Sequence, residues 1–172
     1  LGPVLVQGFG QWESPQVMTI LDQQQHPDAI ASGKLHRLQS CGLAMSHVRM
    51  GVMDDAGRLL GADEEGEVVT AGDHLMLGYL NRPQETAALR VGPWQRTGDI
   101  GRIDDEGFVY VSDRAKDMVL RGGENIYSAE VEAAIYEHPA VYEAAVYGLP
   151  HERLGEELAC HVMVRPGETL DV

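Results

Sequence analysis

Lysine, cysteine and phenylalanine are scarce in this sequence. Its 172 residues include two of each, against 27 acidic residues and 13 basic ones. The resulting net charge of -14 excludes the basic face that a nucleic-acid-binding domain needs, and it disfavours docking to anionic lipid. No apolar run approaches the roughly 20 residues that span a bilayer. We therefore expect no transmembrane segment and predict a cytoplasmic protein; its oligomeric state is left open.

Cysteine and histidine offer no framework for a disulfide-bonded or metal-binding domain. Cys41 and Cys160 lie far apart and outside any Cys-x-x-Cys pattern, so we expect two buried thiols in a reducing compartment. The seven histidines share no metal-ligand spacing with another histidine, cysteine or carboxylate. A histidine-based metal site is not expected.

The two ends of the chain predict a piece of a longer protein. The start has no initiator methionine and no basic segment before its apolar residues, so it does not read as a signal peptide. The last residues, Asp171 and Val172, follow a stretch with no closing element. Upstream and downstream portions are therefore expected.

The first two thirds of the chain indicate short strands. Residues 1–6 predict a buried strand and residues 7–10 a glycine-rich turn. Residues 15–43 show no clear pattern: residues 23–27 indicate solvated loop, and Gly33, Ser40 and Gly42 would interrupt any helix. Alternating apolar residues predict strands at 48–52 and 67–70. Pro83 predicts the first turn of a short helix, and a second hairpin is expected over 100–111. Close strands joined by acidic turns favour a small barrel or sandwich.

After Asp113 the pattern changes to strand, helix, strand, strand. Ser128 is the expected N-cap of the helix, and Pro139 its end. The fold class is therefore predicted to be α+β. A barrel-like part over 1–112 is expected to be followed by a hinge at 113–117 and a truncated α/β domain over 118–172.

Three short motifs are ambiguous when each is taken alone. Thr97-Gly98-Asp99 fits a strand-entry turn, residues 113–117 fit a solvated charge cluster, and Gly122-Gly123 fits an ordinary left-handed turn. Their order is more informative. The signatures, in chain order, are Gly10-Gln11-Trp12-Glu13, Gly78-Tyr79-Leu80-Asn81-Arg82-Pro83, Arg96-Thr97-Gly98-Asp99, Asp113-Arg114-Ala115-Lys116-Asp117 and Gly122-Gly123-Glu124-Asn125-Ile126-Tyr127.

This series, over about residues 7–166, resembles the adenylate-forming (AMP-binding) superfamily, which holds acyl-CoA synthetases, peptide-synthetase adenylation domains and firefly-type luciferases. The resemblance implies an ATP-dependent enzyme that joins a carboxylic acid to AMP, releases pyrophosphate and in many members passes the acyl group to coenzyme A. ATP/AMP, Mg2+ and coenzyme A are the implied cofactors, and a small carboxylic acid is the implied substrate.

The resemblance also implies roles for individual residues. Asp99 matches an aspartate that accepts both ribose hydroxyls, and Arg114 matches an arginine at the same ribose. Glu13 matches a catalytic glutamate that helps to hold Mg2+ at the phosphates. Phe9, next to Gly10 in the nucleotide-binding segment, stands where an aromatic ring stacks on adenine.

One position departs from the family pattern. Trp12 stands where the family usually has a threonine whose hydroxyl contacts the phosphate. Three outcomes stay open for this position: the phosphate contact is lost, the indole N–H makes it, or the ring lines the acyl pocket. A fourth interpretation is that the ring packs in the hydrophobic core.

The glycine-rich loop indicates the branch of the superfamily. Gly122 and Gly123 are similar to the loop beside the coenzyme A tunnel of CoA-ligating members, where small residues let the backbone approach a thin ligand. The leading interpretation is therefore an acyl-CoA synthetase for a fatty or aromatic acid. The alternatives are an acyl-AMP ligase without the CoA step and a non-catalytic nucleotide-binding module.

Lys116 lies two residues after the ribose arginine, where the resemblance places the pivot between an adenylating and a thioester-forming pose. Two family features lie outside these residues: a Ser/Thr/Gly-rich phosphate loop, and a catalytic lysine near the end of the small domain. Lys34 and Lys116 are the only lysines in the sequence. We therefore expect the parent to be an enzyme and residues 1–172 alone to be inactive.

Overall fold

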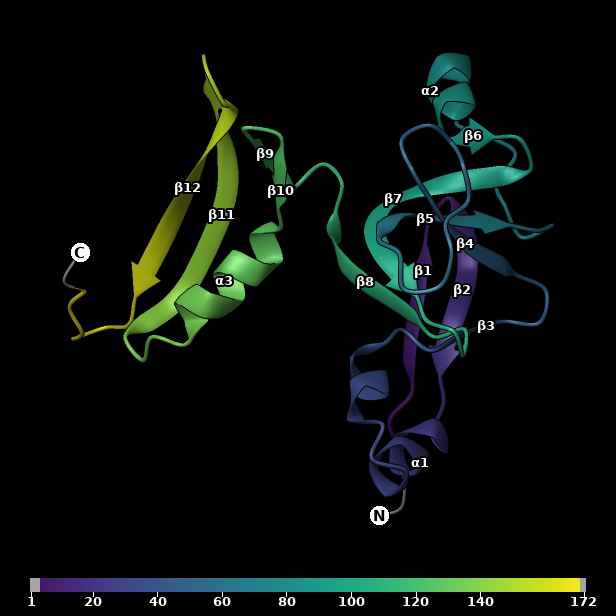
Figure 1. Cartoon of the computed structure of the whole chain (residues 1–172), viewed down its shortest axis with the longest axis horizontal. Helices are drawn as coiled ribbons and strands as arrows, with labels where there is room; N and C mark the ends of the chain where they lie inside the picture. Colours follow the sequence, from purple (N-terminus) through teal and green to yellow (C-terminus); the bar gives the residue numbers. More distant parts are fainter. Residues whose placement is uncertain (1–3, 171–172) are drawn as a thin grey trace. The chain divides into compact units, whose positions relative to one another are not determined.

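The computed structural model describes residues 4–170, and the chain divides into two compact units, Leu1–Val111 and Ser112–Val172 (Figure 1). Antiparallel strands dominate both units and short helices accompany them, which confirms the predicted α+β class. The division falls between Val111 and Ser112, beside the expected boundary. A hinge at 113–117 stays a prediction.

Two antiparallel sheets build the first unit. β1, β2 and β3 form a three-stranded sheet in that order, whereas β4-β5-β7-β6 form a second sheet in which β8 also pairs with β7. β7 is long and curved, so the second sheet curls into a half-barrel (Figure 1). The elements are β1 (Gln7–Gln11), β2 (Ser14–Leu21), α1 (Gln25–Ala31), the 3-10 helix η1 (Leu35–Gln39), β3 (Leu43–Ala44), β4 (Arg49–Met53), β5 (Gly66–Ala71), α2 (Pro83–Ala88), β6 (Arg90–Val91), β7 (Trp94–Ile103) and β8 (Val109–Arg114), which crosses the division.

The second unit is a four-stranded antiparallel sheet with one helix. Its strand order is β10-β9-β12-β11, and α3 packs along β11 (Figure 1). Val119, Val141 and Val146 are buried in this unit. The elements are β9 (Val119–Arg121), β10 (Glu124–Ile126), α3 (Ser128–Tyr136), β11 (Val141–His151) and β12 (Gly155–Val164).

The two sheets of the first unit are joined beside Cys41 and Gly42. Cys41 N donates to Val109 O at 2.7 Å, and Val109 N donates to Gly42 O at 3.0 Å. Gly42 has φ +86°, and a Cβ there would lie 2.0 Å from the Ile20 backbone. Only glycine fits this crossing, because a side chain would collide with β2.

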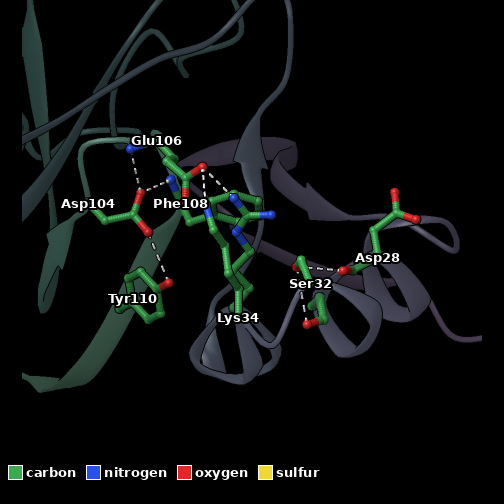
Figure 2. Close-up of polar contacts among 9 residues, drawn as sticks. Asp28, Ser32, Lys34, Asp104, Glu106, Phe108 and Tyr110 are labelled. Carbon is green, nitrogen blue, oxygen red and sulfur yellow. Dashed lines mark hydrogen bonds and ion pairs between the residues drawn. The ribbon is translucent and has the colours of Figure 1, made fainter.

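An acidic turn between β7 and β8 is fixed by its own carboxylates (Figure 2). Asp104 Oδ1 accepts the backbone N–H groups of Glu106 and Phe108 at 3.0 and 2.8 Å, and the Tyr110 hydroxyl donates to Asp104 Oδ2 at 3.0 Å. Glu106 forms ion pairs with Lys34 and Arg37. The turn thereby holds Lys34 and the helix η1 against the half-barrel.

The start of the chain differs from the sequence-based expectation. Residues 1–3 lie outside the described residues, and residues 4–6 form no strand. The glycine-rich segment expected as a turn is β1, because Gly8 and Phe9 pair in register with Ile20 and Thr19 of β2. Residues 15–43, which show no clear sequence pattern, contain most of β2, all of α1 and η1, and the start of β3; α1 begins at Gln25, within the expected loop at 23–27. Tertiary pairing therefore overrides a local glycine signal.

Two further expectations were wrong. Ser128 is the first residue of α3 and not its N-cap; its hydroxyl donates to Asp117 O at 2.5 Å.

Both cysteines are free thiols, but Cys41 is only partly buried and Cys160 is exposed. Among residues 4–170, no helix is long and apolar enough to cross a membrane.

Candidate functional site

Glu13 lies in the tight turn that joins β1 to β2. The pairing of these strands is irregular on both sides of Gly10: Phe9 pairs with Thr19, and Gly10 pairs with Val17. Such irregularities bend a strand and redirect its end. Gly10 is exposed and Phe9 half-buried, so the predicted nucleotide-binding segment is an accessible strand ending in the turn that carries Glu13.

Two contacts hold Glu13 against the segment that leads to α2. The Tyr79 hydroxyl donates to Glu13 Oε1 at 2.5 Å, and Met76 N donates to Glu13 O at 3.0 Å. The hydrogen bond to the carboxylate raises the pKa of Tyr79 to about 12. The phenol therefore stays protonated at neutral pH and remains a donor to Oε1; Oε2 is the carboxylate oxygen that Tyr79 does not contact.

Tyr79 is itself fixed by α2. Its backbone N–H donates to Thr86 Oγ1 at 2.9 Å, and the same hydroxyl donates to Arg82 O at 2.9 Å. A Cβ at Gly78 would lie 2.6 Å from Thr86 Cγ2, so the glycine before the tyrosine permits this close packing. The Gly78–Pro83 signature therefore builds the support of the Glu13 carboxylate.

The Thr97-Gly98-Asp99 motif is a bulge inside β7. Val69 pairs with Arg96 and Glu67 pairs with Ile100, so three residues of β7 lie opposite the single residue Val68 of β5. The strand-entry turn expected for the motif alone is therefore wrong. Bulges commonly re-aim a side chain beside a functional site.

Side chains close this bulge from both strands. Thr97 Oγ1 donates to Val68 O at 2.7 Å and accepts Asp99 N at 3.1 Å. Glu67 Oε1 accepts Gly98 N at 3.0 Å, and the other oxygen of Glu67 pairs with Arg96. Gly98 has φ +76°, a conformation that favours glycine. Every residue of the motif thus has a structural task in shaping the backbone around Asp99.

Asp99 is buried, and its charge acts on the thiol of Cys41, which lies beside β2. The Asp99 side chain is 6% exposed, and its charge adds to burial in raising the pKa of the Cys41 thiol. Thr19, the register partner of Phe9, donates its hydroxyl to Cys41 O at 2.6 Å. Phe9, Gly10, Glu13 and Asp99 therefore all belong to the first unit.

Arg114 and Lys116 are exposed and belong to the second unit; Arg114 is the last residue of β8, and Lys116 lies in the turn that follows. Asp117 N and Met118 N both donate to Arg114 O, at 2.9 and 3.1 Å, which closes the turn. Asp113 Oδ1 accepts Arg114 N at 2.7 Å. Lys116 also lines a pocket of about 340 Å³, whose other lining residues include four carboxylates and the apolar or aromatic side chains of Met118, Val146 and Tyr147. The pocket lies between this turn, the start of α3 and β11.

Gly122 and Gly123 form the turn between β9 and β10. Their φ angles are +63° and +92°. Gly122 N donates to Leu154 O at 2.8 Å, and a Cβ at Gly123 would meet nothing within 4 Å. The outer side of the turn is therefore bare backbone, as a close-approach role for Gly123 requires.

Trp12 projects from the β1–β2 turn, and its side chain is 92% exposed. The core-packing reading of this residue is therefore wrong for this chain. Two other large apolar side chains, Leu77 and Leu80, are also exposed, one beside Met76 and the other beside Tyr79. The two residues that contact Glu13, Met76 and Tyr79, are thus each followed in the sequence by an exposed leucine.

Three residues of this site had no role assigned from the sequence: Tyr79, Glu67 and Gln95. Tyr79 lies inside a quoted signature, so its position was a usable signal. Glu67 and Gln95 lie in no recognisable motif. The hydrogen bond from Gln95 to Glu13 joins residues 82 positions apart and forms only in the folded protein. No group of three His, Cys, Asp or Glu side chains within residues 4–170 is arranged to hold a metal ion.

Comparisons with known proteins match both units. The family described as AMP-binding enzyme matches residues 1–80, and the AMP-binding enzyme C-terminal domain matches residues 130–172. The chain is 38% identical over 170 residues to the medium/long-chain-fatty-acid–CoA ligase FadD8 of Mycobacterium tuberculosis. That match covers 99% of this chain and 28% of the ligase.

Two solved structures have the same fold. The o-succinylbenzoate CoA synthetase MenE of Bacillus subtilis, bound to its acyl-adenylate intermediate, matches with a TM-score of 0.81 and 31% identity. The match covers 95% of this chain and 32% of MenE; another structure of MenE contains ATP and a magnesium ion. The amide bond synthetase McbA of Marinactinospora thermotolerans matches with a TM-score of 0.79 and 34% identity, over 99% of this chain and 34% of McbA. The chain thus spans about a third of these relatives.

Proposed function

The chain belongs to the AMP-binding, or adenylate-forming, enzyme family, and on that basis we propose that the whole protein is an ATP-dependent acyl-CoA synthetase. It would convert a carboxylic acid, ATP and coenzyme A into acyl-CoA, AMP and pyrophosphate through an acyl-AMP intermediate. The observation that carries this proposal is the way the first unit holds two carboxylate residues, Glu13 and Asp99. Glu13 is held by Tyr79, and Asp99 is carried on a bulge of the strand whose Gln95 contacts the Glu13 backbone.

The donor set at Glu13 fits magnesium bound together with phosphates. Mg2+ prefers oxygen ligands and is commonly held by one or two carboxylates plus substrate phosphates. Glu13 is a half-buried carboxylate with one oxygen fixed by Tyr79. Glu13 would hold the ion through its other oxygen, and the bound ion would neutralise charge on the phosphates. Tyr79 would keep the carboxylate oriented for that task.

Asp99, Arg114, Phe9 and Gly10 would bind the nucleotide. A carboxylate can accept both ribose hydroxyls, and a guanidinium supplies forked donors that remain charged. The bulge of β7 supports this role, since it fixes the backbone on both sides of Asp99. Phe9, half-buried on an irregular strand, offers a ring face for adenine, with Gly10 leaving room beside it.

The Gly122–Gly123 turn would border coenzyme A. A backbone without side chains permits close approach of the thin pantetheine arm. The acid is proposed to be fatty or aromatic, in line with the names of FadD8 and MenE. Two free thiols and an acidic composition fit a cytoplasmic enzyme, which stays a prediction.

Acid-dependent ATP–pyrophosphate exchange by the full-length protein tests the first half-reaction. A panel of fatty and aromatic acids should include at least one that supports exchange, and adding coenzyme A should then yield a thioester. Exchange without any thioester would favour an acyl-AMP ligase. ATP binding without exchange would favour a non-catalytic nucleotide-binding module.

One observation favours a second candidate. McbA, named as an amide bond synthetase, matches this chain about as well as MenE does. An acyl-AMP made by the parent would then be passed to an amine in place of a thiol. Supplying the activated acid with amines and with coenzyme A in parallel separates these two fates.

A further inference from the structure

Gln95 is a fully buried polar residue in the middle of the half-barrel. Its backbone lies in β7 between Thr70 of β5 and Arg90 of β6, and the residue is 0% exposed. Its side chain donates one hydrogen bond, from Nε2 to Glu13 O at 3.2 Å. Gln95 Oε1 is buried and accepts no hydrogen bond from the described residues.

This arrangement is unfavourable for a residue that only fills the core. A buried acceptor without a partner costs about 1–3 kcal/mol, whereas an apolar side chain of similar size would leave no such group. Residues that break a packing rule are expected where function requires them. The interaction that distinguishes Gln95 from an apolar residue of the same shape is its contact with Glu13.

The contact falls on a backbone atom that controls the Glu13 turn. Glu13 O accepts both Gln95 Nε2 and Met76 N, so both of its lone pairs are used. Arg90 Nη2 donates to Met76 O at 2.6 Å, which secures the segment on the opposite side. Tyr79 holds the carboxylate of the same residue. Glu13 is therefore fixed at its main chain and at its side chain by different residues.

We propose that Gln95 is a positioning residue that sets the placement of Glu13 for magnesium–ATP, through the main chain of the β1–β2 turn. This inference rests on the proposed function, in which Glu13 holds the ion. Tyr79 orients the carboxylate, while Gln95 and Met76 determine where its backbone stands. The next residue, Ser14, is also 0% exposed, and its Oγ has no hydrogen-bond partner among residues 4–170.

Gln95→Met in the full-length protein tests the proposal. Methionine matches glutamine in length and removes both the donor and the unpaired acceptor, so the unfolding midpoint should not fall. The apparent KM for magnesium–ATP should rise about three- to tenfold, as expected for one neutral hydrogen bond, with the KM for the acid unchanged. Gln84→Met, on the exposed surface of α2, is the matched control and should leave both values unchanged.

Hydrogen exchange at the Met76 amide gives a readout that needs no activity. Because Met76 N donates to Glu13 O, displacement of the turn should speed exchange at this amide in Gln95→Met and not in Gln84→Met. The Met76 amide of Gln95→Met could exchange its hydrogen faster even though the wild-type protein catalyses no ATP–pyrophosphate exchange. That result would support the positioning role of Gln95 and contradict the proposed function. Unchanged amide exchange together with an unchanged KM for magnesium–ATP would overturn the inference.

Gln95→Glu adds a pH-dependent test with an isosteric side chain. The protonated carboxyl group retains a donor for Glu13 O, whereas the ionised form presents only acceptors. The rise in KM for magnesium–ATP caused by Gln95→Glu, measured against wild type at the same pH, should therefore become smaller as the pH falls. The rise in KM caused by Gln95→Met should not depend on pH in this way. A defect with the same pH dependence in both variants would contradict donation as the mechanism.

Discussion

The hydroxyl of Tyr79 donates a 2.5 Å hydrogen bond to Glu13 Oε1, joining residues 66 positions apart. This contact links two sequence signatures that have no connection along the chain. It also explains why the Gly78–Pro83 signature is needed, since Thr86 and Gly78 position the tyrosine. The carboxylate proposed to meet the phosphates is therefore built by the β1–β2 turn and α2 together.

Tyr79→Phe removes this donor and keeps the ring. A hydrogen bond to a charged group contributes about 1.5–3 kcal/mol when one partner is buried, and Tyr79 is half-exposed, so a smaller loss is expected. The apparent KM for magnesium–ATP should rise about tenfold, which corresponds to about 1.4 kcal/mol. Tyr142→Phe, on an exposed tyrosine of the second unit, is the control. An equal KM for magnesium–ATP in the two variants would show that Tyr79 does not contribute to the site.

Asp99→Ala should weaken adenylation about ten- to a hundredfold at subsaturating ATP. The physical reason is loss of a charge-assisted contact to ribose, which contributes roughly 1.5–3 kcal/mol when desolvated. Asp105→Ala removes an exposed aspartate of the neighbouring turn and should have no such effect. If ATP affinity and rate survive in Asp99→Ala, the carboxylate serves only the bulge.

Lys116→Pro tests the hinge. Proline fixes φ near -65° and restricts Ala115, and a disfavoured backbone conformation costs about 1–3 kcal/mol. If the adenylating pose tolerates this angle, acyl-AMP formation should persist while transfer to coenzyme A slows roughly five- to a hundredfold. Separate assays of the two half-reactions on the full-length protein measure this.

Lys116→Ala is the control for the lysine charge, because it leaves the backbone free. Lys116 is exposed, so a solvated surface role is the competing interpretation. Under that interpretation proline would impair both half-reactions equally or neither, and the hinge assignment would be wrong.

Glu106→Gln should reduce stability in a pH-dependent manner. Hydrogen bonds from Arg37 and Lys34 lower the pKa of Glu106 to about 2, below its ordinary value of 4.5. A lowered folded-state pKa contributes stability that is fully present above pH 4.5 and is lost as pH falls through about 2. Urea unfolding should therefore show a lower free energy of unfolding for the variant than for wild type at pH 7. This difference should become smaller towards pH 3.

Salt provides the control for this ion-pair cluster. The pairs are partly exposed, so 0.5–1 M NaCl, at a Debye length of about 3–4 Å, should also narrow the gap at pH 7. A gap of constant size across pH and salt would instead indicate that the substitution acts through packing of the turn.

Local chemistry explains which parts of the fold were predictable. The second hairpin was expected from an acidic turn flanked by apolar residues, and the side chain of Asp104 indeed fixes that turn. The helix at Pro83 was expected because proline suits a first turn. By contrast, the glycine-rich segment at residues 7–10 gave a turn signal, yet pairing with β2 makes it a strand. Elements fixed by contacts between residues four or five positions apart could thus be predicted from the sequence. Elements fixed by pairing with a distant segment could not.

The sequence by itself determined the family, the α+β class and the candidate residues, because these depend on short contiguous signatures and local turn chemistry. Only the tertiary structure decided how those residues are supported. The bulge around Asp99 arises from the register of β5 against β7, and the support of Glu13 comes from Tyr79 and Gln95, 66 and 82 positions away. The physical reason is that strand register and the burial of Gln95 are properties of the assembled sheets, which no contiguous stretch of residues encodes.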